Sequence, residues 1–171
     1  NAGAKGASGE FVYFVNDDTM FESTQSFFDN ALPIFGDKKN LAITCKFHVF
    51  PEDIRISDKM FHGFYNNYVR ALNKIGMGMG RGECQIIRND VFKKVNGYNE
   101  LLAAGEDYDL YRRIKKLGIG RIKFLSNVLV YESPRRYRKF GYLKVLGDWT
   151  KNSFSVFFKN RSISEEWEQV R

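Results

Sequence analysis

The apolar residues of this chain fall into short continuous runs and longer stretches with a helical period. Residues 11–15 form an apolar run between Gly9 and Asn16, which is typical of a strand buried on both faces in a largely parallel sheet. Across residues 58–74, apolar side chains recur every three or four positions, which predicts a helix with an aromatic core-facing stripe. The whole pattern predicts strands over 11–15, 41–50, 83–88, 122–125 and 128–131, and helices over 22–35, 58–74, 89–95 and 106–118.

Four alternating glycines occupy the segment 75–82, between a predicted helix and a predicted strand. Glycines cradle a pyrophosphate when a strand precedes them and a helix follows at once, and this segment has the reverse order. We therefore expect a mobile loop here rather than a nucleotide fingerprint.

The C-terminal part of the chain is basic and amphipathic. Aromatic and aliphatic residues recur every three positions at Phe140, Leu143, Leu146 and Trp149, and from Arg112 onward fifteen Lys+Arg stand against five Asp+Glu. We therefore divide the chain into a domain of residues 1–134 and a helical tail of residues 135–171. The apolar stripe fits equally an anionic membrane surface or packing on the sheet.

Composition narrows the class of protein. The 171 residues, 43% of them hydrophobic, suffice for one cored domain, and no apolar run approaches the about 20 residues of a spanning helix. Cys45 and Cys84 lie inside strand-like segments, where a buried free thiol is the usual state. These features predict a cytoplasmic protein.

Two acidic clusters carry the candidate chemistry. Asn16-Asp17-Asp18 follows the first predicted strand, and Glu106-Asp107-Tyr108-Asp109 opens a predicted helix. Ligands of open α/β sheets bind at the carboxyl ends of strands, and carboxylates there can hold a divalent cation. The two clusters together predict a metal-assisted transferase.

The flanks of these clusters carry a more specific resemblance. Residues 1–10 (NAGAKGASGE) lead into the apolar strand and Asn-Asp-Asp, residues 88–100 read RNDVFKKVNGYNE, and residues 105–113 read GEDYDLYRR. In this order the three segments resemble the family 2 glycosyltransferases, which have a GT-A fold. Nothing in the chain corresponds to the family's N-terminal portion, which holds the nucleotide base, so we expect a C-terminal portion of such an enzyme.

The resemblance implies a Rossmann-like, mixed and mostly parallel sheet flanked by helices. It also implies an inverting transfer of one sugar from a nucleotide-diphosphate sugar to a glycan or lipid-linked acceptor, as in cell-envelope polysaccharide biosynthesis. The processive signature Q-x-x-R-W is absent after Asp107, which favours transfer of a single sugar. Nucleic acid is not an expected partner.

Each site residue is assigned by its position in the family motifs. Asp107 aligns with the catalytic base, and its place at a helix N-terminus would favour the carboxylate form. The acceptor-side residues would be Glu106, Tyr98, Asn99 and Glu100. The donor-side residues would be Asn16, Asp17, Asp18, Arg135 and Arg136. Mn²⁺ or Mg²⁺ would be held by Asp18, with Glu132 as a further oxygen ligand.

Two other classes of function fit the same residues. Clustered carboxylates also serve two-metal phosphoryl hydrolases, which need no sugar donor. The basic tail alone would suit a non-catalytic module that binds a membrane or nucleic acid, with salt-dependent binding that does not need Asp107. A peripheral contact with the inner face of the plasma membrane is compatible with the transferase as well.

Overall fold

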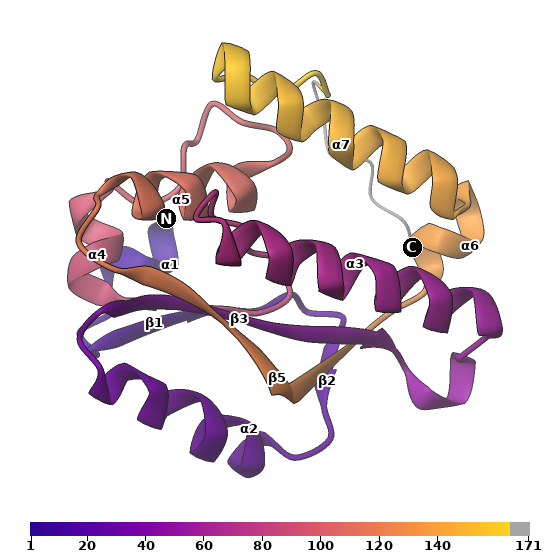
Figure 1. Cartoon of the computed structure of the whole chain (residues 1–171), viewed down its shortest axis with the longest axis horizontal. Coiled ribbons are helices and arrows are strands. Elements are labelled where there is room, and N and C mark those ends of the chain that lie inside the picture. The colour runs from indigo at the N-terminus through magenta and orange to yellow at the C-terminus, as the bar shows by residue number, and fades with distance from the viewer. Residues whose placement is uncertain (165–171) are drawn as a thin grey trace.

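A computed structural model describes residues 1–164 and shows a five-stranded mixed sheet with helices on both faces (Figure 1). The strands, in the order β1-β4-β3-β5-β2, are β1 (Phe11–Phe14), β2 (Thr19–Phe21), β3 (Asn40–Val49), β4 (Gln85–Arg88) and β5 (Arg121–Glu132). The α-helices are α1 (Ala2–Lys5), α2 (Thr24–Ala31), α3 (Ile56–Lys74), α4 (Asn89–Lys94), α5 (Glu106–Lys116), α6 (Arg135–Phe140) and α7 (Tyr142–Lys159), and two 3-10 helices are η1 (Leu32–Gly36) and η2 (Pro51–Asp53). The predicted mixed α/β fold is confirmed.

The strand pairing differs from the mostly parallel sheet that was expected. Strands β3 and β5 pair in parallel, whereas β1–β4, β4–β3 and β5–β2 are antiparallel. β1 lies at the edge of the described sheet, so Val12 is buried while its neighbours are only half-buried. Because β1, β3 and β5 run in the same direction, the segments that follow them meet at one edge of the sheet.

Helices form layers on the two faces of this sheet. Figure 1 shows α2 on one face, α3 and α5 on the other, and α7 lying outside them. Each interface has its own apolar cluster: one around Phe27 and Phe47 under α2, one around Leu110 and Tyr111 under α5, and one around Tyr65 and its neighbours between α3 and α7. The third cluster forms one wall of the cavity described below.

Strand β5 is continuous where two short strands were predicted. Its register against β3 shifts between the pairs Cys45–Leu125 and Lys46–Leu129. The polar residues Ser126 and Asn127 lie in this irregularity, which explains why the apolar pattern was interrupted there. Cys45 and Cys84 are both buried and free, as predicted.

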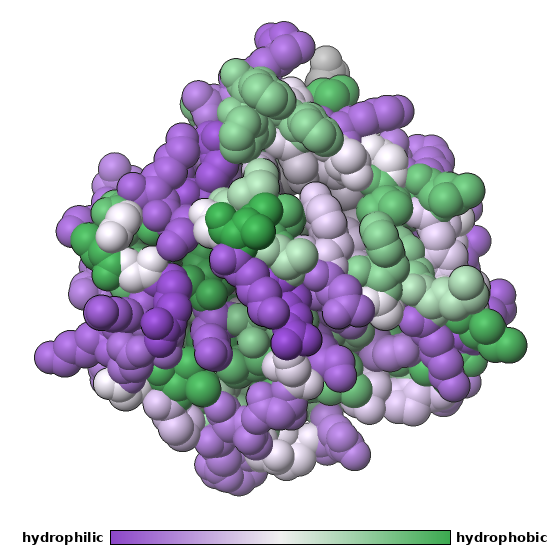
Figure 2. Space-filling view, viewed as in Figure 1, coloured by the Kyte–Doolittle hydropathy of each residue, from purple (hydrophilic) through white to green (hydrophobic). Residues whose placement is uncertain are grey.

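Helix α3 buries one side of its apolar stripe and exposes the other. Phe61 and Tyr65 are buried, but Met60 and Phe64 are 71% and 59% exposed. Figure 2 shows apolar side chains over this outer face. The prediction that the whole stripe belongs to the core is therefore wrong for the outer half.

The tail packs on helices rather than on the sheet. Val145 and Val156 of α7 are buried in the cluster shared with α3, while Leu143 and Phe158 remain exposed. Arg112 of α5 donates a hydrogen bond of 3.0 Å to the carbonyl of residue 157. Among residues 1–164, no helix combines the length and apolar character needed to cross a bilayer. Residues 165–171 of the predicted tail lie outside the described residues.

Candidate active site

One cavity of about 810 Å³ brings the two acidic clusters together. Its walls come from the β1–β2 connection, the glycine-rich loop, the start of α5, the end of β5, and helices α6 and α7. Its polar and charged lining includes Asn16, Asp17, Asp18, Arg81, Glu83, Glu106, Asp107, Glu132, Ser133, Arg135 and Arg136. Residues about ninety positions apart in the sequence thus line the same cavity.

The first acidic cluster lies against the segment that follows β5. The Asp18 carboxylate forms an ion pair of 3.2 Å with Arg135, and both side chains are substantially exposed. Arg136 lies over the ring of Phe140, 5.8 Å from its centroid. The predicted donor-side residues from two distant segments are therefore assembled at the same end of the cavity.

The second acidic cluster opens helix α5. Gly105 precedes it with φ of +79°, a left-handed conformation that glycine adopts without strain. Burial raises the pKa of Asp107, against the lowering effect of the Tyr108 N–H group and the Arg81 charge. Burial and the neighbouring Asp107 raise the pKa of Glu106 to about 7. The N–H groups at the helix start therefore favour the carboxylate form of Asp107, but burial outweighs them.

The second half of the glycine-rich loop, from Gly78 onward, is packed against the cavity, whereas Ile75 and Met77 at its start are exposed. Asn73 holds it through both amide atoms: its Nδ2 donates to the Met79 carbonyl at 2.7 Å, and its Oδ1 accepts from the Met79 N–H at 2.9 Å. A Cβ at Gly80 would lie 2.6 Å from the Tyr111 ring, so only glycine fits. The loop is fixed by these contacts, in contrast to the mobile loop that was expected.

Arg81 emerges from this loop as the central buried cation. Its side chain forms ion pairs with Glu132 at 2.8 Å and with Glu83 at 3.0 Å. Its guanidinium carbon lies 4.4 Å from the centroid of the Phe47 ring. Two carboxylates and an aromatic face thus compensate the burial of this charge.

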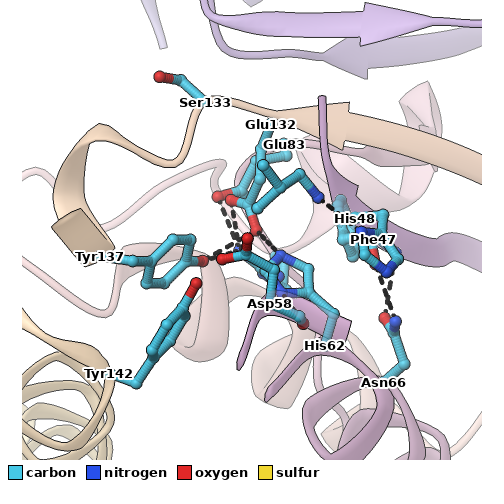
Figure 3. A network of polar contacts seen from close by, with 12 residues as sticks. Phe47, His48, Asp58, His62, Asn66, Glu83, Glu132, Ser133, Tyr137 and Tyr142 are labelled. Carbon is cyan, nitrogen blue, oxygen red and sulfur yellow. Dashed lines mark hydrogen bonds and ion pairs between the residues drawn. The ribbon is translucent and has the colours of Figure 1, made fainter. Parts of the chain in front are cut away.

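Glu132 is enclosed by donors, as Figure 3 shows for the network around it. Besides Arg81, its Oε1 lies 2.8 Å from His62 Nε2 and accepts from the Tyr137 hydroxyl at 2.8 Å. Burial opposes its ionisation, but Arg81 and His62 outweigh burial and lower its pKa to about 2. The structure therefore places Glu132 in a buried ion-pair network, which corrects its assignment as a metal ligand.

Of the four residues assigned to the acceptor side, Glu106 lines the main cavity, and the other three line two smaller pockets, with Tyr98 in both. Tyr98 lines a smaller pocket together with Glu106 and Asp107. Asn99 and Glu100 line a separate pocket beside Asn1, whose Nδ2 donates to Glu100 Oε1 at 2.7 Å. Asn99 and Glu100 do not line the cavity of Asp107, because the turn after Gly97 directs them toward the chain's first residue, so their acceptor role stays a prediction.

Several lining residues were not recognised as site residues from the sequence. Arg81 and Glu83 frame the end of the glycine-rich loop, while Tyr65, Trp149 and Ser153 come from α3 and α7. The glycines were a usable signal for Arg81, since close packing of that loop requires them. The aromatic residues had no signal of their own, because the same spacing is typical of a core-facing helix.

The end of the cavity with the predicted donor-side residues, here called the donor end, offers oxygen atoms of the kind that Mg²⁺ and Mn²⁺ bind. Asp17, Asp18 and the amide of Asn16 line the cavity side by side. Within residues 1–164, no group of three or more His, Cys, Asp or Glu side chains has metal-binding geometry. This fits a cation held by one or two carboxylates and by substrate phosphates rather than by a complete protein cage.

No protein-family model matches the sequence, and no curated protein matches it either. Solved structures do match. The mannosyltransferase PcManGT from Pyrobaculum calidifontis, in complex with GDP-Man and Mn²⁺, has a TM-score of 0.68 over 92% of this chain and 42% of its own, at 16% identity. This chain has the GT-A fold.

Two further solved structures share the fold. TarS from S. aureus has a TM-score of 0.55 at 18% identity, covering 97% of this chain and 27% of its own. Glucosyl-3-phosphoglycerate synthase from Mycobacterium tuberculosis, in complex with phosphoglyceric acid, has a TM-score of 0.50 at 12% identity, covering 90% and 50%. The chain thus spans half or less of each of these structures.

Proposed function

We propose that the full-length protein is an inverting glycosyltransferase that moves one sugar from a nucleotide-diphosphate sugar to a hydroxyl acceptor. The observation that carries the proposal is the meeting of Asn16, Asp17 and Asp18 with Glu106 and Asp107 in one cavity. A transferase of this kind needs one group of residues for the departing diphosphate and another for the acceptor's proton. The GT-A fold of the solved relatives supports the same reading.

In this mechanism Asp107 accepts the proton of the acceptor hydroxyl. The freed oxygen attacks the anomeric carbon from the side opposite the diphosphate, so a new C–O bond forms as the bond to phosphate breaks, and the configuration inverts. A carboxylate with a raised pKa is the stronger base, and burial provides that shift at Asp107.

Asp18 and Asp17 would hold Mn²⁺ or Mg²⁺ at the donor end. When bound, the cation supplies positive charge against the leaving diphosphate. Arg135 and Arg136 lie at the same end of the cavity, where each guanidinium can donate two parallel hydrogen bonds to the diphosphate oxygens. Nucleotide entry then requires Arg135 to exchange its Asp18 partner for phosphate.

The proposal is tested by titrating the full-length protein with nucleotide sugars that differ in base and sugar, with and without Mn²⁺. The expected result is metal-dependent binding of at least one nucleotide sugar, with release of nucleoside diphosphate when an acceptor is added. Cleavage of simple phosphate esters without any sugar donor would instead assign the cavity to a phosphoryl hydrolase.

We further propose a glycan or lipid-linked acceptor, with the enzyme peripheral at the cytoplasmic face of the membrane. The outer side of α7 supports this, since exposed Leu143 and Phe158 accompany Lys144 and Lys151 on one helix. Sedimentation with liposomes should rise with anionic lipid and fall with salt. Changing Lys139, Lys144 and Lys151 to Glu should reduce it, and binding indifferent to lipid charge would reject the membrane role.

A further inference from the structure

Part of the cavity wall carries no formal charge at all. This part, here called the uncharged arm, is formed by α3, α7, the glycine-rich loop, and the start of α5 with the segment before it. Its lining residues are Tyr65, Met79, Leu102, Ala103, Ala104, Gly105, Tyr108, Trp149, Asn152 and Ser153. Most of its apolar members belong to the single cluster between α3 and α7, so the arm is one continuous surface. It begins beside the first residues of α5, where Asp107 lies.

Trp149 provides a fixed aromatic surface in this arm. Its ring is held by Tyr65, with centroids 5.4 Å apart, and by Tyr137 in an edge-to-face contact at 6.1 Å. The Arg81 guanidinium carbon lies 5.4 Å from the ring centroid. The side chain is only half-buried and lines the cavity. A held, partly exposed indole face is suited to stacking against the C–H face of a pyranose ring.

Neighbouring contacts fix the shape of the arm. The Asn152 Oδ1 accepts hydrogen bonds from the N–H groups of Ile163 at 2.9 Å and Ser164 at 3.2 Å. The Ala103 N–H donates to the Ser162 hydroxyl at 3.2 Å. The returning segment after α7 therefore braces both sides of the arm. Asn152 is committed to this bracing, which leaves the indole and the Ser153 hydroxyl as surface for a ligand.

The electrostatics of the arm argue against an anionic ligand. Arg81, the cation beside Trp149, is already paired with Glu132 and Glu83. The groups at the inner end of the arm are the acids Glu106 and Asp107. A phosphate or carboxylate placed here would meet like charges without a free counter-charge, whereas sugar hydroxyls can hydrogen-bond to carboxylates.

We propose that the uncharged arm binds the acceptor as a neutral carbohydrate, with one sugar ring stacked on Trp149 and a hydroxyl directed to Asp107. The inference rests on the proposed function and deepens it, since it names the acceptor class and a residue that selects it. A sugar terminus can belong to a free glycan or to a lipid-linked one. The stacking requirement is the same for both.

The test uses the full-length protein with its preferred nucleotide sugar and two sets of acceptors. Neutral disaccharides (cellobiose, lactose, mannobiose and chitobiose) are compared with hexose 6-phosphates. We expect transfer to at least one neutral disaccharide, a rise of about tenfold in acceptor KM for Trp149→Ala, and a smaller rise for Trp149→Phe. Phe64→Ala, which removes an exposed ring from the outer face of α3, is the matched control and should leave acceptor KM unchanged.

The outcomes separate this inference from the proposed function. Slow release of nucleoside diphosphate without acceptor reports donor chemistry alone. If that release is present while only hexose phosphates accept sugar, or while the two Trp149 variants keep the wild-type acceptor KM, the inference is wrong and the transferase stands. An absence of both donor binding and donor cleavage overturns both. An octyl glycoside of the accepted sugar identifies a lipid-linked acceptor if the alkyl chain lowers KM.

Discussion

Glu132 and Asp107 line the same cavity, yet their surroundings have opposite effects on their acidity. Glu132 is paired with Arg81 and His62, and its pKa falls to about 2. Asp107 is half-buried in the cavity wall but has no ion-pair partner among the described residues, and burial raises its pKa. Burial acts in the same direction on both carboxyls, so the difference comes from the partners.

This contrast separates two roles for acids within one site. A carboxylate held by an ion pair and hydrogen bonds is a weak base and serves the structure. A carboxyl that is desolvated without an ion-pair partner is a stronger base at the cost of folding stability.

The largest effect on stability is expected at Arg81. Its replacement by Met leaves the buried Glu132 and the half-buried Glu83 without their shared cation, so the free energy of unfolding should fall by about 3–5 kcal/mol. Urea denaturation followed by circular dichroism measures this. Lys144→Met is the matched control, because its pair with Asp148 is about half-exposed, and the expected loss is below about 1 kcal/mol.

A double variant sharpens this prediction. Replacing Arg81 and Glu132 together by Met removes the unpaired charge as well as its partner, so much of the lost stability should return. If the double variant is less stable than Arg81→Met alone, the loss does not come from the uncompensated Glu132 carboxylate. The contrast between the paired and unpaired acids would then need another cause.

An intermediate effect is expected at the donor end. Asp18→Ala should weaken Mn²⁺-dependent nucleotide-sugar binding about tenfold, and more than Asp17→Ala does, because Asp18 already engages Arg135 beside the proposed diphosphate position. Calorimetry with and without Mn²⁺ compares the two variants. A larger loss for Asp17→Ala would show that the assignment of the motif is displaced by one residue.

The smallest effect concerns Glu106. Its pKa in the folded protein is about 7, against an ordinary value of 4.5. The unfolded chain therefore ionises first, and the folded state loses stability as the pH rises from about 4.5 to about 7. Glu106→Gln should raise the free energy of unfolding on the order of 1 kcal/mol at pH 8 and by little at pH 4. An equal change at both pH values would show that ionisation is not its cause.

The fold and the two acidic clusters were predictable because they depend on local patterns. The apolar run of β1 and the helix that starts at Glu106 place the two acidic clusters at the ends of these elements. The motifs that flank the clusters occur in the order of the family, which identified the fold. The continuity of β5 was not predicted, because the polar residues Ser126 and Asn127 interrupt its apolar pattern at one of the register shifts against β3. Strand pairing could not be predicted from the sequence, because the order of strands in the sheet follows from packing rather than from the periodicity of apolar residues.

The network around Glu132 could not be predicted for a different reason. It joins Arg81 from the glycine-rich loop, His62 from α3 and Tyr137 from α6, three segments with no shared motif. In the sequence, an acid at the end of a strand has the same pattern around it whether it binds a metal or pairs with a buried guanidinium. Only the positions of its partners decide between a ligand and a structural ion pair.

The central claim is that Asp107 is the base of a sugar-transfer reaction, and Asp107→Asn in the full-length protein tests it most directly. Transfer rate and nucleotide-sugar dissociation constant are measured side by side. The account predicts that transfer falls by about 10²–10⁴-fold while the dissociation constant changes little, because the substitution removes a proton acceptor and no phosphate ligand. Turnover close to that of the wild type, or a loss explained by weaker donor binding alone, would contradict it.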